Sequence, residues 1–419
     1  MTHFGIVCPA ATGHLNTLNP LGYELKQRGH RVTVISIEDA REKVEAAGLE
    51  FVAIAREEYP VGHTKEIFDK LGSLKGIAAM KFTVDAIANG ANILMAYAPE
   101  VIKKEGIEAL LVDQASCEGG TIAEHCGIPF VSICSAIMLN EEISVPPCIT
   151  DWDYDPSWVG KIRNSIGYAA INIGRLPLLN VINRYRRQWV LKPFIHIDEA
   201  YSDLAQISQQ PEEFEFPRRK LPTTFFFAGS FNSPTSRKPI PFPYEKLTGQ
   251  PLIYASLGTV QNRLLPIFQS IIAACTELDV QLVIALGGGL KPESLDESAK
   301  GTNTIVVGYA PQLELLQKAD LTITHAGMNT TLESLSCGVP MVAIPITNDQ
   351  PGVAARIVWT GAGEKISPRA VNPSRLRNLI QQVLSNPSYK KNALRLQQAM
   401  EQAGRQKRAA DIIEKAIAS

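Results

Sequence analysis

The sequence predicts an α/β protein with two doubly wound domains, each built on a parallel β-sheet. Short apolar runs rich in β-branched residues alternate with helical segments in both halves of the chain. A proline-rich stretch separates the halves, and 419 residues with 45% hydrophobic content suffice for two cores. In open sheets of this kind, ligands bind beyond the carboxyl ends of the strands. The expected site is therefore a cleft between two facing domains.

The first half alternates predicted strands and helices. Leu15, Leu18 and Leu25 recur at helical spacing after the first strand, and EGGTIAEHCG (118–127) has helical character. Strands alternating with helices imply a parallel sheet covered on both faces. The strands are expected at HFGIV (3–7), RVTVISI (31–37), EFVAIA (50–55), EALLVD (108–113) and PFVSIC (129–134).

The second half repeats this scheme. RLLPIFQSIIAACTEL (263–278) is helical, and Asn372 with Pro373 is a typical helix start. We expect a first domain at 1–229, a linker at 230–248 and a second domain at 249–400. The strands are expected within PLIYASLG (251–258), QLVIALGGG (281–289), NTIVVGYA (303–310), LTITHAG (321–327) and PMVAIPI (340–346).

Composition excludes several classes of protein. The net charge of −1 gives no general attraction to nucleic acid. Seven scattered cysteines without a C-x-x-C pair indicate buried thiols in a reducing compartment. The start MTHFGIVCPAATGH has no basic region typical of a signal peptide, and no apolar run has membrane-spanning length. We expect a soluble cytoplasmic monomer that binds small molecules.

The stretch THAGMNTTLESLSCGVPMVAIPITNDQ (324–350) carries the densest set of ligand-binding side chains. Gly327 is expected to allow a tight turn into a helix, whose N-terminus attracts anions. His325, Asn329 and Thr330 add donors there, and Glu333 lies one turn later, where it suits a ribose diol. Asp349 and Gln350 follow the next strand and suit a second sugar. The stretch therefore predicts binding of a nucleotide diphosphate sugar.

From Tyr309 to Gln350 the pattern YAPQLELL…THAGMNTTLESLSCGVPMVAIPITNDQ resembles the donor-binding signature of family 1 glycosyltransferases. These form the UDP-glycosyltransferase superfamily, which has the GT-B fold of two Rossmann-like domains. The chain is similar over nearly its whole length, in particular to bacterial zeaxanthin and macrolide glucosyltransferases. The resemblance also implies that the final helix (401–419) packs back on the first domain, where Ala409, Ile412, Ile413 and Ala416 would cover its surface.

The resemblance implies a role for each motif residue. Tyr309 replaces the usual tryptophan that stacks on uracil, and this substitution leaves the identity of the base less certain. Asp349 and Gln350 match the pair that holds the transferred sugar, and glutamine at the last position is associated with glucose. The remaining donor-site residues are Ala310 and Gln312 at the nucleoside, Glu333 at the ribose, and Ser256, Gly258, Thr259, His325, Gly327, Asn329 and Thr330 at the diphosphate.

His14, in PAATGHLN after the first strand, matches the catalytic base of the family, and Asp113 matches its partner. The resemblance thus implies an inverting transfer of glucose from UDP-glucose to a hydroxyl of an apolar small molecule, without cofactor or metal. The acceptor would be of carotenoid, polyketide or macrolide, sterol or flavonoid type. An epimerase or hydrolase of similar fold, or a non-catalytic sensor of sugar nucleotides, remains an alternative.

Two motifs compete with this interpretation. LGGGL (286–290) lacks the G-x-G-x-x-G spacing of a dinucleotide loop. DWD (151–153) resembles a metal-binding pair but lacks flanking strands, so we expect a surface or acceptor loop and no bound metal.

The region 140–194 is expected to form the acceptor side. Two helical faces are interpreted as core, with some residues lining an acceptor pocket. A weak contact of RYRRQW (184–189) with a membrane surface is left open beside the simpler interpretation as a solvated face. The two apolar faces are Ile162, Ile166, Ala169 and Ile173, and Leu178, Ile182, Tyr185 and Trp189.

Overall fold

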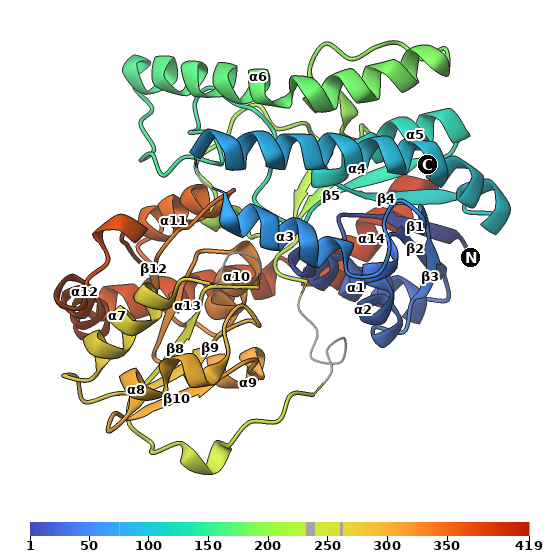
Figure 1. Cartoon of the computed structure of the whole chain (residues 1–419). Helices are drawn as coiled ribbons and strands as arrows, with labels where there is room; N and C mark the ends of the chain where they lie inside the picture. The colour runs from blue at the N-terminus through green and yellow to red at the C-terminus, as the bar shows by residue number, and fades with distance from the viewer. Residues whose placement is uncertain (75, 232–238, 260–262, 419) are drawn as a thin grey trace.

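The structure is a computed structural model that describes residues 1–74, 76–231, 239–259 and 263–418. It contains two α/β domains stacked one above the other, with a long helix along the outer edge of the first (Figure 1). The predicted fold class is confirmed: each domain has one wholly parallel sheet with helices on both faces.

The first domain holds a seven-stranded sheet in the order β3-β2-β1-β4-β5-β6-β7. Side chains of alternate residues enter different cores, as the pleat of a strand requires. Phe4 and Ile6 pack with α1, α2 and α14, whereas Val7 and Val112 pack with α4 and α5. The strands are β1 (His3–Val7), β2 (Arg31–Ser36), β3 (Glu50–Ala53), β4 (Ala109–Asp113), β5 (Phe130–Cys134), β6 (Gln206–Ser208) and β7 (Phe225–Phe227).

The second domain holds a six-stranded sheet in the order β10-β9-β8-β11-β12-β13. Ile253 and Ile323 face α7 and α12, while Tyr254 faces α9. The strands are β8 (Leu252–Ser256), β9 (Gln281–Ala285), β10 (Thr304–Val307), β11 (Leu321–Thr324), β12 (Met341–Ala343) and β13 (Gly363–Lys365).

The helices follow the predicted alternation. In α12 the Asn372 side chain accepts a hydrogen bond from the Arg375 amide, as expected of an N-cap. The helices are α1 (Thr12–Gln27), α2 (Arg41–Ala46), α3 (His63–Ser73), α4 (Gly76–Glu105), α5 (Glu118–Cys126), α6 (Trp158–Gln188), α7 (Leu265–Cys275), α8 (Asp296–Ala299), α9 (Gln312–Leu316), α10 (Met328–Ser336), α11 (Gln350–Trp359), α12 (Pro373–Ser385), α13 (Pro387–Gln402) and α14 (Arg405–Ala418).

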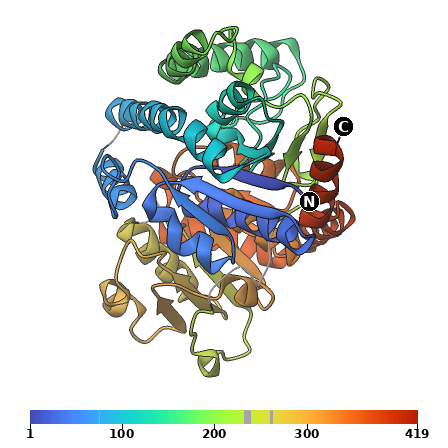
Figure 2. The same cartoon turned by 90° about the vertical axis from the view of Figure 1, so that its right-hand side faces the viewer.

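The C-terminal helix α14 lies against the first domain, beside α1 (Figures 1 and 2). Ala409, Ala410 and Ile413 are fully buried in the same core as Phe4 and Leu18. On the surface, Arg28 donates to the carboxylates of Asp411 and Glu414. The last helix thus ties the end of the chain to the sheet that carries the predicted catalytic pair.

Replacing Ile413 with alanine should lower the free energy of unfolding by about 2–3 kcal/mol, because the site is closed on all sides by fixed helices and strands. Urea denaturation of the variant measures this loss. Lys415→Ala, at an exposed position of the same helix, is the control and should remain within about 0.5 kcal/mol of the parent. Equal losses in both variants would contradict a buried role for Ile413.

Helix α6 corrects one sequence expectation. Ile162, Ile166 and Ile173 were expected in a core, yet they are 52%, 66% and 69% exposed, and Ala169 is exposed as well. The opposite side of the helix holds the buried residues, among them Asn164 and Ile182. Most buried residues of the helix are polar or glycine, such as Gly160, Asn164 and Asn183, so periodicity alone assigned the apolar, exposed side to the core. None of the helices in the described ranges is long and apolar enough to cross a membrane.

The stretch RYRRQW is packed on one side and solvated on the other, where Arg184, Arg187 and Gln188 are exposed. Arg186 is buried and donates to Glu124 of α5, and Trp189 stacks on His125. Tyr185 packs against the same core as Trp189, as expected for this second apolar face.

Candidate active site

His14 and Asp113 meet at the carboxyl edge of the first sheet. Strands β1 and β4 are parallel neighbours, so the helix that follows β1 and the last residue of β4 lie at the same edge. His14, in the first turn of α1, has its Nδ1 2.8 Å from Oδ2 of Asp113. The other carboxylate oxygen of Asp113 accepts from the Ala115 amide. This arrangement leaves Nε2 of His14 as the free, basic nitrogen.

The environment of His14 stabilises the protonated form of its imidazole. Burial acts to lower the pKa of the imidazole, but the charge and hydrogen bond of Asp113, with a contribution from Asp349, outweigh burial and raise the pKa above 6.5. Asp113 is almost fully buried, and 23% of the His14 side chain is exposed. The imidazole can therefore take a proton from outside and pair with Asp113 when charged.

Two residues of this site were missed in the sequence. Ser135 directly follows β5, and its hydroxyl lies 2.8 Å from Nδ1 of His14. Gln209 directly follows β6, and its amide donates to the carbonyl of Ser135 and to Oδ1 of Asn329, the latter at 2.9 Å. The position of Ser135 directly after a predictable strand is a signal that could have identified it. Gln209 offered no such signal, because β6 is too short to be recognised by periodicity.

Asn329 joins the two domains. Its Nδ2 donates to the carbonyl of Gly13 at 2.7 Å, and its Oδ1 accepts from Thr17 at 3.1 Å as well as from Gln209. The first turns of α1 and α10 are thus held together, next to His14. A hydrogen bond from the Asn329 side chain to a diphosphate stays a prediction. To form it, Asn329 would have to give up at least one of its bonds to Gly13, Thr17 and Gln209.

His325 lies between two glycines. A Cβ atom at Gly258 or Gly327 would come within 2.5 or 2.3 Å of its Nε2. Gly327 itself has an ordinary φ of −66°, and the left-handed residue of the turn is Ala326 with φ 61°. The expected reason for Gly327 was therefore wrong: the glycine is required by the imidazole and not by a backbone turn.

Burial lowers the pKa of His325 to about 4, and its buried Nδ1 has no hydrogen-bond partner among the described residues. The ring is therefore neutral at pH 7, and it also makes a hydrogen bond with the backbone of Ser256. It lies at the N-terminus of α10, as predicted for a group that contacts an anion. In the neighbouring loop, Ser256 accepts from the Gly258 amide at 3.4 Å, and Thr259 is exposed.

The predicted nucleoside residues lie between β10 and α10. Tyr309 is 56% exposed. Its hydroxyl lies so close to Gly288 that a Cβ atom at that position would be only 2.2 Å away. Gly288 belongs to LGGGL, which therefore leaves space for an aromatic ring. Gln312 donates from its side-chain Nε2 to the buried Glu333 carboxylate at 2.6 Å. The backbone amide of Gln312 donates to the carbonyl of Ala310. Gln312 and Glu333 therefore meet on α10, and a contact of Tyr309 with a nucleoside stays a prediction.

Asp349 and Gln350 lie at the start of α11, and Asp349 contacts the first domain. Asp349 accepts from the Ile137 amide at 3.4 Å, and burial raises its pKa. Gln350 accepts with Oε1 from the amides of Ile346 and Thr347, at 2.8 and 2.9 Å. Its oxygen supports the loop before the helix, so its side-chain NH₂ is the group that remains for a ligand.

The DWD motif lies on the surface near the second domain. Lys365 of β13 donates to the Asp151 carbonyl at 2.6 Å and pairs with the Asp153 carboxylate at 3.6 Å. Within the described ranges there is no group of three or more His, Cys, Asp or Glu residues that could hold a metal ion.

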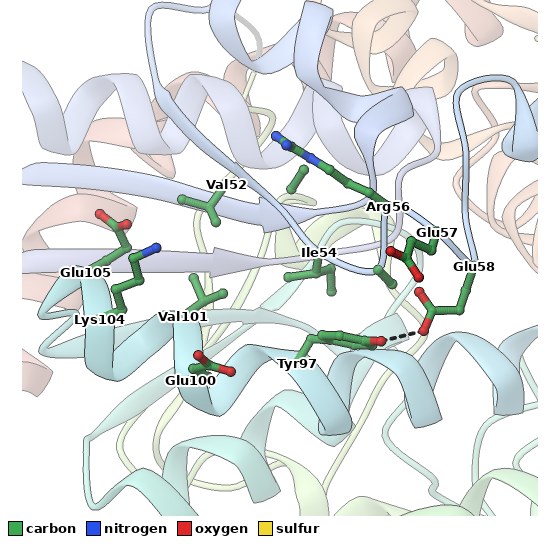
Figure 3. Close-up of a pocket in the computed structure, with 12 residues that line it drawn as sticks. Val52, Ile54, Arg56, Glu57, Glu58, Tyr97, Glu100, Val101, Lys104 and Glu105 are labelled. Atoms are coloured by element: carbon green, nitrogen blue, oxygen red, sulfur yellow. Dashed lines mark hydrogen bonds between the residues drawn. The ribbon is translucent and has the colours of Figure 1, made fainter.

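A cavity of about 500 Å³ lies elsewhere, between the edge strand β3 and helix α4 (Figure 3). It is lined by Val52, Ile54 and Val101 at its base and by Glu58 and Tyr97, which are hydrogen-bonded to each other. None of the predicted site residues lines it, so the candidate site remains the edge where the two domains meet.

Comparison with known proteins identifies the family of the chain. The profile of the family "UDP-glucoronosyl and UDP-glucosyl transferase" matches residues 103–403. Two proteins named zeaxanthin glucosyltransferase, from Pantoea ananas and Pseudescherichia vulneris, are 31% and 32% identical over 100% of this chain and 96% and 98% of their own. The crystal structure of the glycosyltransferase of kitacinnamycin superposes with a TM-score of 0.79, 23% identity and 99% coverage of both chains. The chain belongs to the UDP-glucoronosyl and UDP-glucosyl transferase family and is a glycosyltransferase with the GT-B fold.

Proposed function

We propose that the protein transfers glucose from UDP-glucose to a hydroxyl group of an apolar small molecule, with inversion and without a metal. The observation that carries the proposal is the pairing of His14 with Asp113 at a domain boundary across which Asp349 faces the imidazole. A base on one domain and a sugar-binding carboxylate on the other suit a reaction between two substrates. The relatives named zeaxanthin glucosyltransferase support an apolar, hydroxyl-bearing acceptor.

In this mechanism, Nε2 of His14 accepts the proton of the acceptor hydroxyl as its oxygen bonds to the anomeric carbon. Asp113 keeps the proton of Nδ1 in place and stabilises the imidazolium that forms. The bond from the anomeric carbon to the phosphate oxygen breaks on the opposite face, and UDP leaves with the electron pair. A single displacement converts an α-linked donor into a β-glycoside.

The leaving diphosphate would be stabilised by donors that are already fixed. The N-terminus of α10 supplies backbone amides, and the neutral His325 supplies an N–H at the same point. These groups need no reorganisation while charge develops, which is the reason for proposing catalysis without a metal.

Incubation of the protein with UDP-glucose, with and without a panel of alcohols, tests the reaction class. Mass spectrometry should detect a hexosylated alcohol only when an alcohol is present, and the NMR coupling constant of its anomeric proton should report a β-glycoside. Free glucose without an alcohol would indicate a hydrolase, an isomerised sugar nucleotide an epimerase, and an unchanged donor a sensor. Each of these outcomes contradicts the proposal.

Metal removal and donor choice are tested separately. Turnover should persist in EDTA, and UDP-glucose should be preferred over dTDP-glucose and GDP-glucose. Activity that disappears in EDTA and returns with Mn²⁺ would contradict the metal-free mechanism. A preference for another nucleotide would contradict the predicted donor and leave the transfer chemistry intact.

Glu333→Ala should weaken UDP binding by about 1.5–3 kcal/mol, because a buried carboxylate would lose its hydrogen bonds to the ribose diol. Calorimetry of UDP binding measures the loss, while the KM for the acceptor should stay near that of the parent. Glu314→Ala, at an exposed position on α9, is the matched control and should bind UDP normally. Equal UDP affinity in the Glu333 variant and the parent would contradict the proposal that Glu333 binds the ribose.

A further inference from the structure

Helix α6 presents an apolar face to the outside of the molecule, which we call the outer face of α6. It includes an aromatic residue, Trp158, which is 73% exposed, and three isoleucines more than half exposed. In Figure 1 the helix runs along the edge of the first domain, on the far side of α4 from the sheet. The residues of the outer face are Trp158, Val159, Ile162, Ile166, Ala169, Ile173 and Leu176.

The outer face is distinct from the packed side of the helix. Gly160, Asn164 and Tyr168 are buried, and their spacing of four residues defines the packed side. Ile162, Ile166 and Ile173 lie about half a turn away from that line, at the helical repeat of about 3.6 residues. The apolar stripe from residue 158 to 176 is about 27 Å long at about 1.5 Å per residue. It is a continuous surface and not a set of scattered exposed residues.

The charges on α6 are all of one sign. The helix carries six basic residues and no acidic residue, although the whole chain has a net charge of −1. Arg175 and Arg186 pair inward with Glu141 and Glu124. The exposed members include Lys161 beside the outer face, and Arg184 and Arg187 beyond its C-terminal end. Arg184 lies eleven residues after Ile173, about three turns, and so continues the same side of the helix.

We propose that the outer face of α6 docks on an anionic lipid surface. An apolar stripe edged by basic side chains, with tryptophan at one end, has the chemistry of a helix that lies in the membrane interface. The isoleucines would enter the acyl boundary while Lys161, Arg184 and Arg187 contact lipid phosphates. A second copy of the chain fits less well, because the charges that α6 itself carries are all positive and would repel those of another α6.

The docked helix is linked to the candidate active site. Asn164 donates to the Ile143 carbonyl, and the Tyr168 hydroxyl donates to the Val145 carbonyl, so the packed side of α6 holds the loop that leads from β5 to this helix. That loop continues to Cys148, whose carbonyl lies against Gly352 in the first turn of α11. If the proposed function holds, an apolar acceptor partitioned into the lipid would enter beside this loop, near Asp349.

Co-sedimentation of the purified protein with lipid vesicles tests the proposal, and it needs no substrate. The protein should bind vesicles of phosphatidylglycerol and phosphatidylcholine, bind pure phosphatidylcholine vesicles more weakly, and dissociate as salt is raised. The triple variant Ile162→Gln, Ile166→Gln and Ile173→Gln should lower the partition coefficient at least about tenfold. Lys161→Glu with Arg187→Glu should weaken binding to the anionic vesicles alone.

The matched control replaces three exposed apolar residues elsewhere, Val61→Gln, Ile87→Gln and Leu394→Gln, and should bind vesicles as the parent does. The triple α6 variant should keep the parental melting temperature and transfer sugar to a water-soluble acceptor at the parental rate. A parent that ignores anionic vesicles, or an α6 variant that binds them equally, overturns the proposal. A parental dimer that the α6 variant dissociates, seen in sedimentation velocity without vesicle binding, would assign this face to a second copy. Failure of all sugar transfer would overturn the proposed function alone.

Discussion

Replacing His14 with alanine is expected to reduce sugar transfer to an alcohol by about 10²–10⁴ while UDP binding stays nearly unchanged. The imidazole belongs to the first domain, whereas His325, Glu333 and the N-terminus of α10 belong to the second. The variant therefore loses the proton acceptor without losing the predicted nucleotide ligands. Transfer rates with saturating donor and calorimetry of UDP binding separate the two effects.

The pH profile distinguishes a base from a merely structural histidine. Only neutral His14 can accept a proton, so turnover should fall as pH drops through its pKa, which Asp113 and Asp349 raise above 6.5. Asp113→Asn removes the main charge that raises this pKa, so the acidic limb should move to lower pH while the maximum rate also falls.

Acceptor acidity supplies a further control. Thiols and acidic phenols need less help in losing a proton, so His14→Ala should retain more activity with them than with ordinary alcohols. Parental transfer to an alcohol by His14→Ala would place the base elsewhere. An acidic limb at the same pH in Asp113→Asn and the parent would separate Asp113 from the titrating group.

Long elements and local motifs were predictable from the sequence. Apolar runs such as Ala109–Asp113 and Leu252–Ser256 are buried on both faces of parallel sheets, which gives them a continuous hydrophobic pattern. Strands β6, β7 and β13 have three residues each, too few for a period to be visible. They were missed although they complete the sheets, because tertiary pairing and not local pattern forms them.

The candidate site likewise contains contacts that the sequence predicts and contacts that it does not. His325, Asn329 and Glu333 are close in sequence on one turn and helix, so their proximity follows from local structure. The hydrogen bonds of Asn329 to Gly13 and Gln209 join residues 316 and 120 positions apart, and such contacts depend on how two domains meet. The prediction that Ile162, Ile166 and Ile173 of α6 lie in a core was wrong for a related reason. Helical periodicity identifies an apolar side of a helix but not what covers that side.

The second large effect concerns a buried ion pair between the domains. Arg356 of α11 is fully buried and makes two hydrogen bonds to Glu215 of the first domain, from Nε at 3.0 Å and from Nη2 at 2.5 Å. Arg218 lies 3.4 Å from the same carboxylate, and Phe216 packs on the guanidinium of Arg356. Since α11 begins next to Asp349, this pair also holds the predicted sugar-binding turn against the first domain.

Glu215→Gln should lower the free energy of unfolding by about 3–5 kcal/mol, because a buried guanidinium loses its counter-charge. Replacing both Glu215 and Arg356 by methionine should cost less than Glu215→Gln, because the buried charge of Arg356 is then removed as well and only Arg218 still loses its carboxylate partner. Urea denaturation of the single and double variants measures the difference. Glu45→Gln removes an exposed partner of Arg41 and is the matched control, with an expected cost below about 1 kcal/mol.

The same pair predicts a pH dependence of stability. Burial acts to raise the pKa of Glu215, but Arg356 and Arg218 outweigh it and lower the pKa from 4.5 to about 2. A lowered pKa means that the carboxylate stabilises the folded protein fully above about pH 4.5 and loses this contribution as pH falls toward 2. The parent should therefore lose stability between these values more steeply than Glu215→Gln. If both proteins lose stability in parallel there, and the single and double variants unfold at the same urea concentration, the pair does not hold the two domains together.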